Sequence, residues 1–150
     1  MITSFFKTSK PFHFIVMSFM ALVLFIWYRK DSFLLEINSI SIVSEILVFL
    51  ALIFSLGVLT FIVSKNSLTQ KNSYHILFFV LFMALMPASF TNNHIVVSNL
   101  FVLLAFRRLI SLKSYIGLKK KLFDATFWIG VASLFYFWAI LFFPLIFIAL

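Results

Sequence analysis

Long apolar stretches alternate with short polar segments along this chain. The first three stretches are 11–28, 42–63 and 74–90, and Glu45 is the only charged residue within them. At about 1.5 Å per residue, a helix over 11–28 just crosses a hydrocarbon core of about 30 Å. The pattern therefore predicts membrane-spanning helices over these three stretches. Pro87, near the end of the third, fits a helix terminus or a local kink.

The C-terminal part of the pattern is less regular. The apolar run 95–106 is too short to cross alone, and extending it to 91–110 adds polar ends, so a re-entrant segment competes with a spanning helix. The last run, 125–150, is too long for one untilted helix, and Pro144 divides it. We predict a fifth helix that ends near Phe143 and the start of a sixth at Pro144.

Positive charge is distributed unevenly among the polar segments. If every predicted helix crosses the membrane, Arg29 and Lys30 lie on one side. All other basic residues lie on the opposite side: Lys7, Lys10, Lys65, Lys71, Arg107, Arg108, Lys113, Lys119, Lys120 and Lys121. Such an excess marks the cytoplasmic side. Without the crossing at 91–110 the bias would be much weaker, so the charges favour about five spans and a cytoplasmic N-terminus.

Composition supports a membrane protein. Hydrophobic residues make up 64% of the chain and charged residues 11%, whereas a soluble domain carries about 25% charged residues. The net charge of +8 lies beside apolar runs, which indicates cytoplasmic loops and anionic lipid rather than nucleic acid. We predict an all-α polytopic transmembrane helical bundle, with the bilayer, anionic lipids and other membrane proteins as partners.

Both ends of the chain bear on its organisation. Lys7 and Lys10 precede an apolar run, as in a signal peptide, but no small-residue cleavage site follows, so an uncleaved first span is expected. The chain stops at Leu150 within an apolar run. We expect residues 1–150 to form a single transmembrane domain that is the N-terminal part of a longer protein.

Polar residues within or beside the predicted spans gather in one place. They are Asn92, Asn93, His94, Ser98 and Asn99. On a helix, Asn92 and Asn99 share one face and His94 and Ser98 another, so the group does not form a single line. One interpretation is a helix cap followed by interhelical hydrogen bonds, and we weight it above the other. The other interpretation is a site for a headgroup, sugar or phosphate.

A second candidate is the basic loop between the last two predicted spans. Its candidate phosphate or lipid-headgroup contacts are Arg107, Arg108, Lys119, Lys120 and Lys121. Topology and anionic-lipid binding account for it most simply, and the diphosphate of a lipid-linked precursor is the sharper alternative. Asp124 is expected to pair with Lys120 or Lys121. Glu45 lies about one turn inside its span and is expected to reach water.

Several chemistries have no signature in the chain. It has no cysteine, which excludes disulfides, thiolate metal sites and cysteine nucleophiles. Phosphate-binding glycine loops and hydrolase motifs are absent. His13, His75 and His94 belong to different span ends and do not make a metal centre by themselves. We predict no cofactor and leave open whether the protein is an enzyme.

Two segments resemble an uncharacterised family of flavobacterial-type multi-pass inner-membrane proteins, which is defined by a domain of unknown function. They are 1–11 (MITSFFKTSKP) and 122–138 (LFDATFWIGVASLFYFW). The resemblance extends over the whole chain and implies the N-terminal part of a longer protein. It implies no activity, so it assigns no functional residue.

Two functions remain open on this evidence. The leading hypothesis is an accessory inner-membrane protein of cell-envelope assembly, since catalytic motifs are absent and the loops are small. The alternative is a membrane enzyme or transporter for a lipid-linked glycan or another lipid-phosphate substrate. It rests on the Asn/His cluster, the basic loop and a loose architectural analogy.

Overall fold

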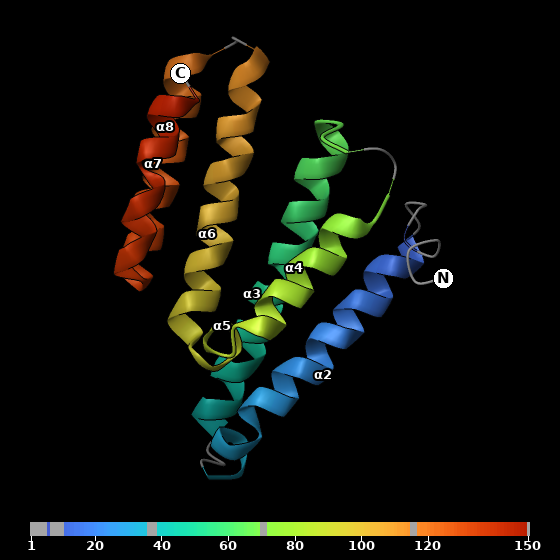
Figure 1. Cartoon of the computed structure of the whole chain (residues 1–150). Helices are drawn as coiled ribbons and strands as arrows, with labels where there is room; N and C mark the ends of the chain where they lie inside the picture. Colours follow the sequence, from blue (N-terminus) through green and yellow to red (C-terminus); the bar gives the residue numbers. More distant parts are fainter. Residues whose placement is uncertain (1–5, 7–10, 36–38, 70–71, 115–116, 150) are drawn as a thin grey trace. The chain divides into compact units, whose positions relative to one another are not determined.

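The chain is helical throughout the part that the structure describes (Figure 1). The computed structural model describes residue 6 and residues 11–35, 39–69, 72–114 and 117–149. Within these residues there are α-helices, two short 3-10 helices and no β-strand. The prediction of an all-α protein is therefore confirmed.

Three helices are long and apolar enough to cross a membrane. They are α2 (Pro11–Leu35), α3 (Ser39–Lys65) and α6 (Asn93–Ile110), and the candidate spans within or around them are Pro11–Lys30, Ile42–Lys65 and Asn93–Lys113. The apolar segments Tyr74–Leu85 and Phe137–Ile148 are shorter. A membrane protein follows from these helices, while a bundle of about five spans stays a prediction.

The chain divides into two compact units, Met1–Asn93 and His94–Leu150. In the first unit, α2 packs against α3, against α4 (Tyr74–Leu85) and against α5 (Ala88–Thr91), and α3 also packs against α4. Buried Ala21 on α2 lets a neighbouring helix approach closely, and Leu52, Leu56 and Val80 fill the interior. Large apolar side chains on the other faces, such as Phe19 and Leu47, are exposed, as expected for lipid contact.

The predicted span 74–90 is not one helix. Helix α4 ends at Leu85, Met86 leaves helical geometry (φ −117°, ψ 87°), and α5 begins after Pro87. Proline has no N–H and its ring clashes with the preceding turn, which explains a break at this point. Asn92 is extended (φ −100°, ψ 111°) and ends α5. The chain then continues directly into α6.

The second unit is a helical hairpin with a returning C-terminal segment. After α6 come η1 (Ser111–Ser114), α7 (Leu118–Phe135), η2 (Phe137–Phe142) and α8 (Pro144–Ile148). Gly117 has φ +66°, a left-handed conformation that glycine adopts without a Cβ clash, and α7 starts immediately after it. Ala105 and Leu109 of α6 pack with Ala125 and Ile129 of α7 in the core of this unit.

The predicted end of the fifth helix is wrong. Helix α7 ends at Phe135 rather than near Phe143, because Tyr136 is extended (φ −143°, ψ 107°) and redirects the chain. The η2 and α8 segments then pack back along α7 (Figure 1). Ala132 and Ala139 are both buried where the two segments meet, and their small side chains permit close contact. Pro144 does begin a new helix, as predicted.

Candidate functional site

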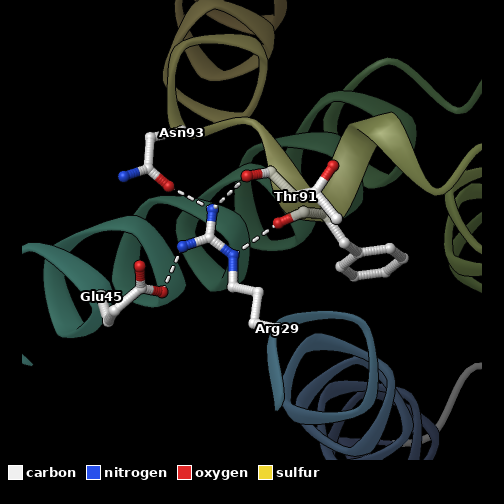
Figure 2. Close-up of polar contacts among 5 residues, drawn as sticks. Arg29, Glu45, Thr91 and Asn93 are labelled. Carbon is white, nitrogen blue, oxygen red and sulfur yellow. Dashed lines mark hydrogen bonds and ion pairs between the residues drawn. The ribbon is translucent and has the colours of Figure 1, made fainter. Parts of the chain in front are cut away.

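The most unusual polar feature of the first unit is a buried arginine. Arg29 lies near the end of the candidate span in α2, yet its residue surface is only 6% exposed. Its guanidinium points toward the end of α5 and the start of α6 (Figure 2). A charged group inside an apolar helix bundle is expensive unless it is paired, and it is a functional-site candidate for that reason.

The guanidinium of Arg29 donates hydrogen bonds to four oxygens. Nε donates to the carbonyl oxygen of Phe90 at 2.6 Å, and Nη2 donates to the carbonyl oxygen of Thr91 at 3.3 Å. Nη2 also donates to Oδ1 of Asn93, and Nη1 forms an ion pair with Oε2 of Glu45 (Figure 2). We call Arg29, Glu45, Phe90, Thr91 and Asn93 the Arg29 cluster.

Each partner in the Arg29 cluster has a local reason to be there. The carbonyls of Phe90 and Thr91 lie at the C-terminal end of α5, where helix carbonyls lack intrahelical partners. A cation at a helix C-terminus is also favoured by the helix dipole. Glu45 lies on α3 and supplies the neutralising charge, with its side chain 24% exposed. The cluster therefore ties α2, α3 and residues 90–93 of the first unit together.

Aromatic side chains surround the cluster. The Arg29 guanidinium carbon lies 4.7 Å from the centroid of the Phe25 ring, which is close enough for a cation–π contact. Tyr28 stacks on Phe90 with ring centroids 5.5 Å apart, and its hydroxyl donates to the carbonyl oxygen of Ala84 at 2.9 Å. An apolar ring beside the guanidinium lowers the local dielectric constant, which strengthens the attraction between Arg29 and Glu45.

The sequence interpretation missed this cluster, although a signal was present. The sequence pattern places Arg29 among the loop charges, whereas it lies within α2 and is buried. Glu45 was expected to reach water; it is partly exposed but is paired with Arg29. Opposite charges near the same end of two consecutive predicted spans could have suggested the pair.

The predicted Asn/His group has several fates. Asn93 accepts from Arg29 in the first unit. Ser98 is buried in the second unit and donates to the carbonyl oxygen of Ala132 at 3.0 Å, an interhelical bond of the kind that the packing interpretation predicts. Asn92 and His94 are exposed, and Asn99 is half-buried. A ligand-binding role for these residues stays a prediction.

The basic loop has two kinds of cation. Arg108 pairs with Asp124 (Nη2 to Oδ2, 3.1 Å), a partner that we did not predict. Lys121 donates from Nζ to the carbonyl oxygen of Ser111 at 2.6 Å. Arg107, Lys119 and Lys120 are exposed. Two of the five predicted phosphate contacts therefore also hold α7 to neighbouring segments of its own unit.

The histidines do not form a metal site within the residues that the structure describes. His13 is buried on α2, and its Nδ1 lies 3.1 Å from Oγ of Ser73. The residues that the structure describes contain no group of three or more metal-ligating His, Asp or Glu side chains.

Scans against family models, curated proteins and solved structures found no match for this chain. The resemblance to the flavobacterial-type family thus stays a prediction.

Proposed function

We propose that this chain is an accessory integral membrane protein of cell-envelope assembly that performs no catalysis. The observation that carries the proposal is the Arg29 cluster. The buried guanidinium of Arg29 in this cluster binds one carboxylate and three further oxygens of the same chain. Such a group stabilises a helix arrangement instead of acting on a substrate, which is the role expected in a scaffold.

The proposed location is the bacterial inner membrane, with the N-terminus in the cytoplasm and about five crossings. The charge distribution and the three long apolar helices support this topology. Single cysteines can be introduced at the exposed positions Lys30, Thr69, Asn92 and Lys113 of this cysteine-free chain. In intact cells an impermeant maleimide should label Lys30→Cys and Asn92→Cys but neither Thr69→Cys nor Lys113→Cys. Labelling of Lys113→Cys with Thr69→Cys protected would contradict a crossing by α6.

A rescue experiment tests the accessory role. Loss of the gene should sensitise cells to detergent and to cell-wall antibiotics. The variant Asn92→Ala/His94→Ala/Asn99→Ala should restore resistance fully, because a scaffold does not need a polar reaction site there. The matched control is Ser64→Ala/Thr69→Ala, exposed polar positions on and after α3. If the triple variant reaches wild-type membrane levels but fails to rescue while the control succeeds, the non-catalytic role is wrong.

The second candidate is an enzyme or transporter for a lipid-linked glycan or another lipid-phosphate substrate. The exposure of Asn92 and His94, and of the cations at the other end of α6, favours it. Arg107 is the appropriate residue to test, because Arg108 also pairs with Asp124. On this hypothesis Arg107→Ala abolishes rescue without loss of membrane insertion. Full rescue by Arg107→Ala would remove its main support.

A further inference from the structure

One end of the second unit is strongly basic. Where α6 ends and α7 begins, the unit has six cations: Arg107, Arg108, Lys113, Lys119, Lys120 and Lys121. Asp124 is the only acidic residue in the sequence of this unit. We call these six cations the basic end. The charge excess raises the question of which cations are available to an external anion.

Contacts and exposure divide five of the six cations of the basic end into two sets. Arg108 and Lys121 are half-buried. Arg108 pairs with Asp124 and holds α6 to α7, and Lys121 donates to the Ser111 carbonyl and holds α7 to η1. Lys113, Lys119 and Lys120 are exposed. Since the sole carboxylate of the unit already pairs with Arg108, these three lysines carry charge toward the surroundings.

The exposed face of α7 has a lysine near its start and two phenylalanines further along the helix. Lys119, Phe123 and Phe127 are four residues apart and therefore share one face of the helix. Phe123 is 70% exposed and Phe127 is 53% exposed. Leu118, Leu122 and Ala125 instead pack into the core of the unit. At 1.5 Å per residue, Phe123 lies about 6 Å and Phe127 about 12 Å further along the helix than Lys119.

This order of side chains matches the boundary of a bilayer. Lysine ammonium groups are favourable at the level of anionic headgroups, while phenylalanine rings are favourable among the acyl chains beneath them. A soluble anion would use the charges but would leave the two exposed rings in water. The row formed by Lys119, Phe123 and Phe127 therefore favours a lipid surface over a free phosphate compound.

We propose that Lys113, Lys119 and Lys120 of the basic end bind the phosphate headgroups of anionic lipids, with Phe123 and Phe127 among the acyl chains below. The proposal depends on the membrane location of the chain and is independent of its role in envelope assembly. A lysine near an anionic surface changes the affinity about fivefold. Three such lysines together contribute on the order of 100-fold.

The test uses the full chain in a neutral detergent. It is titrated with dioctanoyl phosphatidylglycerol or dioctanoyl phosphatidylcholine, and bound lipid is measured by native mass spectrometry. We expect clear preference for phosphatidylglycerol. Lys119→Gln should weaken its binding about fivefold, and Lys113→Gln/Lys119→Gln/Lys120→Gln on the order of 100-fold. The matched control is Lys30→Gln, an exposed lysine of the first unit, which should leave the affinity unchanged.

Three results would overturn the proposal. One is equal binding of the two lipids; another is wild-type affinity in the triple lysine variant. The third is displacement of the lipid by an equal concentration of inorganic phosphate, which would indicate a free-anion site. Far-UV circular dichroism establishes that the variants are folded. Because this binding is measured on purified protein, its failure would leave the rescue experiment for envelope assembly unaffected.

Discussion

Replacing Arg29 by methionine is the sharpest test of what holds the first unit together. Methionine keeps much of the length of arginine but has no donor, so Arg29→Met removes the partner of Glu45, of Asn93 and of two main-chain carbonyls. In a low-dielectric interior these groups become unsatisfied. The variant should insert into the membrane but unfold more easily.

The magnitude follows from two opposing considerations. Removing one partner of a buried ion pair costs about 3–5 kcal/mol in water-soluble proteins. Interhelical polar contacts within membranes are weaker, about 0.6–1.7 kcal/mol each, and the Glu45 side chain is 24% exposed, so part of its charge is solvated. We expect Arg29→Met to lower the free energy of unfolding by about 2–4 kcal/mol.

Two companion variants separate charge from geometry. Arg29→Lys keeps the charge but loses the planar fork that reaches several oxygens at once, so it should recover only part of the loss. Arg29→Met/Glu45→Leu removes both charges and should be more stable than Arg29→Met alone, because no unpaired carboxylate remains. Phe90→Leu, which keeps the carbonyl acceptor of that residue, is a control for the aromatic surroundings.

The assay is unfolding in mixed micelles, in which the helical circular dichroism signal is followed as the SDS fraction rises. The reasoning would be refuted if Arg29→Met unfolded at the wild-type SDS fraction. The single variant Glu45→Leu completes the comparison. The reasoning would also be refuted if Arg29→Met/Glu45→Leu lost the sum of the losses of Arg29→Met and Glu45→Leu, since that additivity would mean that Arg29 and Glu45 do not interact.

Three further predictions concern the second unit and use the same unfolding assay. Ser98→Ala should lower stability by about 1 kcal/mol because it removes the interhelical hydrogen bond to the Ala132 carbonyl, which then keeps only the bond from the Tyr136 N–H, and a wild-type result would mean that the interhelical bond is not formed. Ala139→Leu should cost about 1–3 kcal/mol by overpacking the contact between η2 and α7, whereas Leu141→Ile, at an exposed position, should be neutral. Arg108→Gln should cost less than about 1 kcal/mol, since the Arg108 side chain is 42% exposed in its pair with Asp124, and a larger loss would contradict a surface pair.

Much of the helical framework could be predicted from the sequence, because long uncharged stretches leave the backbone no alternative in lipid. The predicted span 42–63 lies within α3, and residues 93–110 of the contested segment 91–110 form the continuous helix α6. The break at Tyr136 could not be predicted, since neither proline nor glycine marks it. The break lets Ala139 pack against Ala132, and this contact between two segments is not visible in the sequence pattern.

The candidate site was harder to predict for a similar reason. The Asn/His group was found because its polar residues are adjacent in the sequence, and Asn93 does belong to the Arg29 cluster. Arg29 and Glu45 come from different helices, and they meet only because α2 packs against α3. When basic residues are counted to predict topology, Arg29 is one charge among twelve. The count gives no indication that Arg29 also donates hydrogen bonds to the backbone.

Pro87 and Arg29 are best understood as two parts of one arrangement. In an uninterrupted helix the carbonyls of Phe90 and Thr91 would accept from residues four positions further on. The helix restarts at Pro87, and the extended Asn92 then ends α5, so these two carbonyls lack such donors. Thr91 is exposed, whereas Phe90 is fully buried, so the Phe90 carbonyl in particular requires a donor from the protein. Arg29 supplies it, and the ion pair with Glu45 offsets the cost of its charge. The C-terminal end of α5 is therefore stabilised by a charged side chain from α2.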